Sequence, residues 1–273
     1  MGNEASNTLR EILDQSGEYL RWLKEEGVGQ IEVSRRIGAS RQQGVLTMKT
    51  LPDGKRVQTA GRMSVKKTVS AELATEPAGS KPRSVPEIAA EIAGCKRCVL
   101  CRTRTKTVPG QGNLSPEILF VGEAPGADED QQGLAFVGAA GQLLTRMILA
   151  MGLQRDEVFI ANILKCRPPG NRVPTPEEME TCLPYLQEQI RCLQPKVIVA
   201  LGATAVRGLL HSETGITKLR GTWQEFQGIP VMPTFHPAYL LRNPPAKREA
   251  WDDLQAVLHK VGRTPPPVKP VKA

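Results

Sequence analysis

Six cysteines are the first residues of this 273-residue sequence whose type and spacing suggest chemistry. Two residues separate Cys95 from Cys98, and fifteen separate Cys166 from Cys182. Two close thiolates and two distant ones can form a four-sulfur site, which suits either a zinc ion or an iron–sulfur cluster. The wide second spacing is less typical of a zinc ribbon, but spacing alone leaves both groups open.

Two further cysteines are surplus to a four-ligand site. Cys192 lies in an apolar helical stretch and is expected in the core, whereas Cys101 could replace one of the four ligands. The N-terminus shows no secretory signal, so metal or thiol chemistry is favoured over disulfides. Buried free thiols without any metal are the plainer alternative.

Three polar residues follow predicted strands, at equivalent positions along the chain. Glu123 follows the apolar run 118–121, Asn162 follows 158–161, and His236 follows 229–234. Ligands of open α/β sheets bind at the carboxyl ends of parallel strands, so these residues should face one crevice. Taken singly, Asn162 is more typical of a turn, His236 of a capped loop and Phe136 of a core.

These side chains could together handle a flipped nucleobase. An asparagine amide can pair with the O4 acceptor and N3–H donor of uracil, whereas cytosine presents the opposite pattern. The ring of Phe136 can stack on such a base. His236 can stabilise negative charge on a departing base, and the carboxylate of Glu123 can orient water or stabilise a cationic sugar.

The elements that must position these residues alternate between strand and helix. Strands are predicted at 118–121, 158–161, 196–202 and 229–234, with helices at 86–92, 138–151, from Thr175, at 203–210 and at 246–261. Thr175 is the expected N-cap, and Pro184 is expected to kink or split the helix that follows. The residues after Gly122 and those from His236 to Pro244 are expected to form loops. This alternation predicts an α/β fold with a parallel sheet covered on both faces.

The sequence predicts four regions. An amphipathic helix within residues 1–27 would dock on the main domain or on a protein partner, and residues 28–84 resemble a basic, disordered linker. Residues 85–262 would form the compact domain, and residues 263–273 a disordered tail. The net charge of +8 fits a polyanion partner or simply a basic enzyme. The sequence has no membrane-spanning run, and we expect a monomer in the cytoplasm, associated with the nucleoid of a bacterium or archaeon.

Five segments resemble the family 4 uracil-DNA glycosylases, the iron–sulfur branch of their superfamily. They include GEAPGADEDQQGLAFVGAAGQLL and NILKCRPPGNRVPTPEEMETC, and together they are Gly122–Leu144, Asn162–Cys182, Leu201–Ala205, Ile216–Trp223 and His236–Pro244. The resemblance covers about residues 91–261. It implies a three-layer α/β/α sandwich around a four-stranded parallel sheet, and an enzyme that releases uracil from DNA and leaves an abasic site.

The resemblance also implies roles for individual residues. Glu123 would act on water or the sugar cation, His236 would stabilise the uracil anion, Phe136 would stack, and Asn162 would read the base edge. Ala124 and Gly126 would line the substrate site; better-known members of the superfamily have an aspartate where this chain has Ala124. A [4Fe–4S] cluster would be held by Cys95, Cys98, Cys166 and Cys182.

DNA contacts follow from the same resemblance. Leu240 or Leu241 would fill the gap left by the flipped nucleotide, although both could equally be core leucines. Lys165 and Arg242 would contact phosphates. The alternatives are a superfamily member that excises another deaminated base, and a catalytically inactive iron–sulfur protein that only binds DNA. Covalent trapping of the product is disfavoured because the KCRPPGNRVP stretch contains no histidine.

Overall fold

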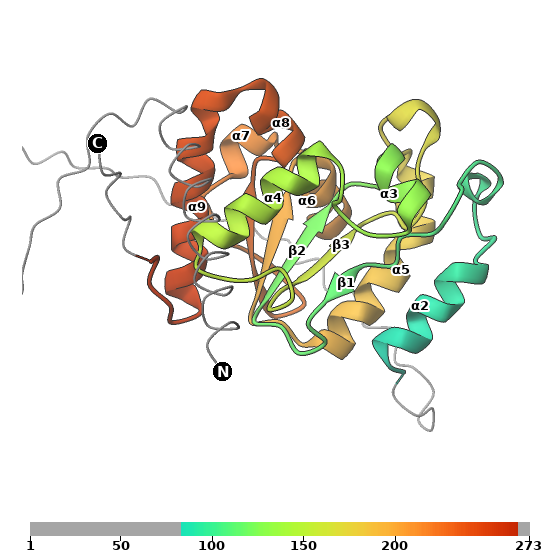
Figure 1. Ribbon diagram of the computed structural model, residues 1–273, viewed down its shortest axis with the longest axis horizontal. Helices are drawn as coiled ribbons and strands as arrows, with labels where there is room; N and C mark the ends of the chain where they lie inside the picture. Colours follow the sequence, from blue (N-terminus) through green and yellow to red (C-terminus); the bar gives the residue numbers. More distant parts are fainter. Residues whose placement is uncertain (1–82, 267–273) are drawn as a thin grey trace, which may run out of the picture. The chain divides into compact units, whose positions relative to one another are not determined.

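The computed structural model describes residues 83–266. The predicted N-terminal helix, almost all of the predicted linker and the end of the predicted tail lie outside the described residues, so those predictions stay untested. The described part is a layered α/β domain (Figure 1).

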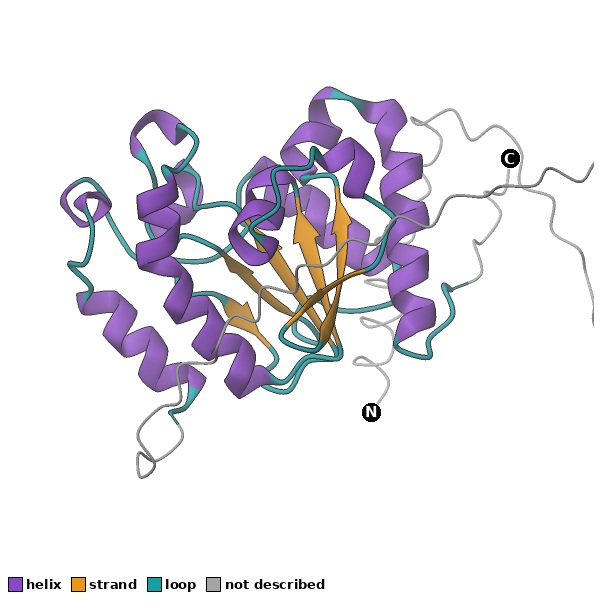
Figure 2. Cartoon of the chain, turned by 180° about the vertical axis from the view of Figure 1, so that it is seen from behind, coloured by secondary structure: helices purple, strands orange, loops and turns teal. Residues whose placement is uncertain are grey.

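One mixed sheet of six strands forms the centre of the domain, in the order β1-β3-β2-β4-β6-β5. The four inner strands run parallel to one another, and each of the two short edge strands runs antiparallel to the inner strand beside it. The expected sheet of four strands is therefore corrected to six, and Figure 2 shows the strands side by side. The strands are β1 (Gln111–Gly112), β2 (Ile118–Gly122), β3 (Phe159–Asn162), β4 (Val197–Leu201), β5 (Gln224–Phe226) and β6 (Ile229–Thr234).

Helices cover both faces of this sheet. Helices α4 (Ala139–Ala150) and α9 (Lys247–Lys260) pack on one face, and α5 (Pro176–Leu193) and α6 (Ala203–Leu210) pack on the other. All residues of β2 and β4 are buried, which explains their uninterrupted apolar sequences. Successive residues of β2 pack on opposite faces of the sheet. Phe120 faces α4 and α9, whereas Leu119 faces α5 and α6.

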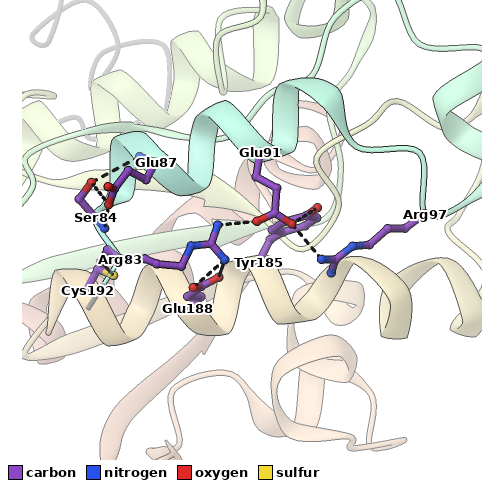
Figure 3. A network of polar contacts seen from close by, with 8 residues as sticks. All are labelled: Arg83, Ser84, Glu87, Glu91, Arg97, Tyr185, Glu188 and Cys192. Carbon is purple, nitrogen blue, oxygen red and sulfur yellow. Dashed lines mark hydrogen bonds and ion pairs between the residues drawn. The ribbon is translucent and has the colours of Figure 1, made fainter. Parts of the chain in front are cut away.

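Helix α2 (Val85–Gly94) lies outside α5 and is fixed to it by a polar network (Figure 3). The hydroxyl of Tyr185 donates to Glu91 at 3.0 Å, and the guanidinium of Arg97 lies 4.6 Å from the centre of the Tyr185 ring. Arg83 bridges from Glu91 on α2 to Glu188 on α5. These contacts hold the end of α2, and with it the cysteine loop that follows.

Several predicted boundaries are confirmed, and their local chemistry explains why. Thr175 caps α5 in a capping box with Glu178, and α6 occupies the predicted residues. Pro184 was expected to kink or split α5. The split is wrong, because one helix runs through Pro184, which is exposed while both neighbours are buried. The kink stays a prediction.

Two segments predicted as loops contain short helices. Helix α3 (Ala127–Gln132) follows β2, and α8 (Pro237–Arg242) follows His236. Helix α7 (Ile216–Leu219) was also not predicted. Each has six residues or fewer, too short for a periodic pattern to show. Among the helices of residues 83–266, none is long and apolar enough to cross a membrane.

Candidate active site and cysteine pocket

A cavity of about 480 Å³ opens at the carboxyl ends of the parallel strands. It brings together all three predicted strand-end residues, Glu123, Asn162 and His236, which confirms that they share one crevice. Phe136, also predicted, lines the same cavity. The other lining residues include Ala124, Gly126, Glu129, Arg172, Tyr239 and Arg242.

Asn162 lies at the inner end of the cavity and has an unsatisfied acceptor. The residue is 1% exposed, and its side-chain Oδ1 is buried without a hydrogen-bond partner in the described part of the chain. Buried polar atoms are nearly always hydrogen-bonded, so an unpaired amide oxygen facing a cavity is ready to bind a ligand donor.

Gly122 makes room for this arrangement. It pairs with Asn162 across β2 and β3, and a Cβ at Gly122 would lie 2.4 Å from Oδ1 of Asn162 and 2.5 Å from Cζ of Phe136. Neither distance is compatible with a side chain. The amide and the aromatic ring can therefore meet only because residue 122 is glycine.

Phe136 is held in an unusual backbone conformation. Its φ of 52° is in the left-handed region, which is uncommon for a residue other than glycine. The first turn of α4 packs directly on it, since a Cβ at Gly141 would lie 2.0 Å from the Phe136 carbonyl oxygen. The ring lies 5.7 Å from that of His236, with 35° between the planes. The strained backbone thus aims the ring into the cavity.

His236 is neutral and carries its proton on Nε2. Its Nδ1 accepts a hydrogen bond from the backbone N–H of Ala238 at 3.1 Å, so Nε2 bears the hydrogen. Burial, with help from the nearby positive charge of Arg242, lowers the pKa of His236 to about 4. A neutral imidazole with a free Nε2–H is suited to donate to an oxygen that gains negative charge.

Glu129 organises the loop between β2 and α4, and the sequence analysis missed it. Its carboxylate accepts hydrogen bonds from the backbone N–H groups of Gly126, Val137 and Gly138, at 3.0, 2.9 and 2.9 Å. It closes the loop that carries Phe136. The signal was present in the sequence, because a glutamate three residues after an N-cap glycine is a variant of the capping box.

Backbone hydrogen bonds connect the segment from Asn162 to Cys166 to β2 and to α5. The N–H groups of Ile163 and Leu164 donate to the carbonyls of Gly122 and Glu123, both at 3.0 Å. The N–H of Lys165 donates to Sγ of Cys182 at 3.3 Å. One short segment therefore connects Glu123, the Asn162 amide and the cysteines.

The cysteines meet in a second, smaller pocket. It is lined by Cys95, Cys98, Cys166 and Cys182, the four predicted ligands, and also by Cys101. Arg104 donates from Nη1 to Sγ of Cys166 at 3.1 Å and from Nη2 to the Cys95 carbonyl at 2.7 Å. Cys192 lies elsewhere and donates to the carbonyl of Arg83.

Burial controls the protonation of these thiols in the absence of a metal. Desolvation raises the pKa of Cys98 and Cys166, and that of Cys182 to about 11. A raised pKa favours the neutral thiol, whereas a bound metal favours the thiolate, because the thiolate is the form that it binds. Across residues 83–266, no three histidine, cysteine or acidic side chains converge closely enough for a single metal ion.

Two of the predicted DNA contacts are corrected. Lys165 is 1% exposed, and its ammonium is used internally, so in this structure it cannot meet a phosphate. Leu240 is also 1% exposed and belongs to the core beside α4 and α9. Leu241 and Arg242, by contrast, are exposed at the same end of the domain.

Comparison with known proteins places these features in a family. Residues 109–255 match the model of the uracil DNA glycosylase superfamily. The type-4 uracil-DNA glycosylase of Archaeoglobus fulgidus is 43% identical over 191 residues, which cover 67% of this chain and 96% of that protein.

Two further relatives refine the placement. The type-4 uracil-DNA glycosylase of Thermotoga maritima is 49% identical over 160 residues, covering 58% of this chain and 83% of that protein. A type-5 uracil-DNA glycosylase of Pyrobaculum aerophilum is 32% identical over 152 residues, covering 50% of this chain and 67% of that protein. The chain therefore belongs to the uracil-DNA glycosylase superfamily, and within it to the type-4 family.

Proposed function

We propose that this protein is a monofunctional uracil-DNA glycosylase, which hydrolyses the bond between uracil and deoxyribose and leaves an abasic site for base excision repair. The observation that carries the proposal is the unpaired Oδ1 of Asn162, buried in a cavity shared with Phe136 and His236. That oxygen can accept the N3–H of uracil while the amide NH₂ donates to O4. The type-4 relatives support the same substrate.

The chemical step uses two residues that line the cavity, His236 at the uracil and Glu123 at the sugar. The bond between C1′ and N1 breaks and its electron pair leaves with uracil, whose O2 receives a hydrogen bond from the Nε2–H of His236. Glu123 lines the cavity and stabilises the cationic sugar or orients the water whose oxygen bonds to C1′. The proton that this water loses balances the one that the uracil anion takes up to become neutral uracil. Ala124 supplies no carboxylate, and that of Glu129, which also lines the cavity, accepts three backbone hydrogen bonds, which leaves Glu123 as the acidic residue of this step.

Binding surfaces complete the substrate site. Phe136 stacks on the flipped uracil, and Ala124 and Gly126 shape the cavity wall around it. Leu241, 41% exposed, fills the gap in the duplex, and Arg242 contacts a phosphate. We place the glycosylase domain at residues 85–262 and its action on the DNA of a bacterial or archaeal cell.

The cysteine pocket suits an iron–sulfur cluster. Cys95, Cys98, Cys166 and Cys182 would hold a [4Fe–4S] cluster, and the donors Arg104 N–H and Lys165 N–H already point at two of the sulfurs. All four of these cysteines line the one pocket, and the resemblance to the iron–sulfur branch of the superfamily favours a cluster over a zinc ion there. When bound, the cluster would cross-link α2, the segment after β3, and α5.

The cluster is proposed as structural, and cysteine substitution tests this role. Replacing Cys166 by serine should remove iron and lower the melting temperature together, because one ligand of the cross-link is lost. Cys192→Ser is the matched control, since Cys192 lies outside the pocket. A Cys166→Ser protein that lacks iron but keeps full thermal stability and activity would refute the structural role.

The function itself is tested with a uracil-containing oligonucleotide in the presence of EDTA. The purified full chain should produce alkali-labile sites at uracil, and Glu123→Ala, Asn162→Ala and His236→Ala should each slow their formation by roughly 10²-fold or more. A wild-type protein that is folded and carries its cluster, yet forms no abasic sites at uracil, would contradict the proposal.

A further inference from the structure

Lys165 is a buried charged residue for which the proposed chemistry has no use. Its Nζ donates to the backbone carbonyl of Asn162 at 2.9 Å and to Oε1 of Gln189 at 2.8 Å. Gln189 comes from α5 and is itself 0% exposed. Burying an ammonium group is costly unless hydrogen bonds compensate, so its presence at this position calls for an explanation.

The hydrogen bonds of Lys165 and Gln189 connect the end of β3 to the segments on either side of it. The Nε2 of Gln189 donates to the carbonyl of Pro109 at 2.8 Å. The backbone carbonyl of Lys165 accepts from the N–H of Val108 at 2.8 Å. Together these hydrogen bonds connect three segments, the chain before β1, the end of β3 and the middle of α5, around the side chain of Lys165.

The Lys165 ammonium binds the backbone of Asn162, the residue whose amide is proposed to read the base. The side-chain Oδ1 of Asn162 has no partner among the described residues, so no protein hydrogen bond to this oxygen fixes the amide. Its position depends on the backbone of Asn162 and on the close approach of Gly122. Without Lys165, the Asn162 carbonyl would lose the hydrogen bond that it accepts from Nζ.

We propose that Lys165 and Gln189 are a positioning pair for uracil recognition, which holds the Asn162 backbone so that its amide meets the edge of the base. The inference rests on the proposed function. Under this proposal Lys165 stabilises the backbone of Asn162, whereas the sequence had predicted that it contacts a phosphate. Neither residue touches the base, so both act through Asn162.

Substitution of Lys165 by methionine removes the ammonium and keeps an unbranched side chain of similar length. The full-length Lys165→Met protein should release uracil about 10- to 100-fold more slowly in single turnover. Its affinity for DNA that contains an abasic site should stay within about 3-fold of wild type, because the DNA-facing residues are unchanged. Lys196→Met is the matched control, since Lys196 pairs with Glu117 at the opposite end of the sheet.

A second readout separates positioning from general destabilisation. The ratio of excision rates for uracil and 4-thiouracil reports the contact at O4, because sulfur is the weaker acceptor. This ratio should fall toward that of Asn162→Ala in the Lys165→Met protein, whereas a loss of stability alone would lower both rates equally. Iron content and melting temperature are measured on the same samples.

Gln189 provides the test if Lys165→Met fails to fold. Gln189→Leu removes the acceptor for Nζ and the donor to Pro109, and it should lower the rate ratio toward that of Asn162→Ala. Gln189→Glu restores an acceptor for Nζ but not the donor to Pro109, so it should recover part of the ratio. If wild type excises uracil and all folded variants keep its rates and its ratio, the positioning role is overturned while the glycosylase function stands. If wild type releases no uracil, the proposed function fails first, and this inference falls with it.

Discussion

Two walls of the active-site cavity differ in how they are held. The inner wall is Asn162, with the buried segment 163–166 behind it, and several backbone groups of this segment are hydrogen-bonded to β2, to α5 and to the chain before β1. The outer wall is α8, where Tyr239, Leu241 and Arg242 are exposed. Under the proposed function, this difference means that the base-reading residue is held in place before substrate binds, whereas the exposed residues of α8 gain partners from the DNA.

The largest effect should come from the inner wall. Asn162→Asp replaces the amide by a carboxylate, which cannot donate to uracil O4 when ionised and repels it. We expect uracil excision to fall roughly 10³-fold or more in single-turnover assays. Retention of wild-type discrimination between uracil and cytosine by this variant would show that Asn162 does not read the base.

Gly122→Ala should damage the same wall without removing any functional group. The added Cβ would collide with both the Asn162 amide and the Phe136 ring, and displacement by about 1 Å should slow excision roughly 10²-fold. Gly94→Ala is the matched control, because a Cβ there has no atom within 4 Å. Equal rates for the two alanine variants would argue against the tight packing of amide and ring.

The adjacent leucines of α8 should respond in opposite ways. Leu240→Ala should lower the free energy of unfolding by about 2–5 kcal/mol, because Leu240 is buried in the core. Leu241→Ala should change stability by less than about 0.5 kcal/mol and slow excision from duplex DNA about 10-fold. Denaturant unfolding and duplex assays on both variants check this, and a fully active Leu241→Ala protein would remove the wedge assignment.

The smallest effect concerns pH and His236. Its pKa is lowered from 6.5 to about 4 in the folded chain, so the unfolded chain binds the additional proton between these values. This contribution to stability is fully present above pH 6.5 and is lost as the pH falls toward 4, by up to about 3 kcal/mol.

His236→Asn isolates this contribution, since asparagine can also cap α8 but does not titrate. Unfolding of wild type and variant is followed by denaturant titration from pH 7 to 4. The free energy of unfolding of wild type, relative to that of the variant, should fall by up to about 3 kcal/mol between pH 7 and pH 4. A constant difference across that range would mean that His236 is not buried in its neutral form.

The sequence predicted the elements with strong periodicity or clear caps. Buried strands such as β2 and β4 are short apolar runs, and α5 begins at a threonine with proline and glutamate in the expected places. The shared cavity followed from strand ends alone, because parallel strands bring their carboxyl ends together. The cysteine pocket followed from four spaced thiols, although spacing did not choose between zinc and iron.

The remaining features depend on tertiary contacts that no local pattern encodes. Strand β1 has two residues, and only its pairing with β3 makes it a strand. Lys165 and Arg242 are both basic residues near the site, and burial by α5 alone turns the first inward. Leu240 and Leu241 are indistinguishable by type, and the orientation of α8 decides which one is core.

The most direct test measures base release from oligonucleotides that differ at one position: uracil, cytosine, thymine or hypoxanthine. The purified full chain with its cluster is assayed in single turnover, in EDTA. The account predicts fast release of uracil and release of cytosine at least about 10³-fold slower, because the Asn162 amide pairs with the O4 and N3–H of uracil and is mismatched to the opposite pattern of cytosine. Preferential release of hypoxanthine, or no release of uracil by a folded protein, would contradict it.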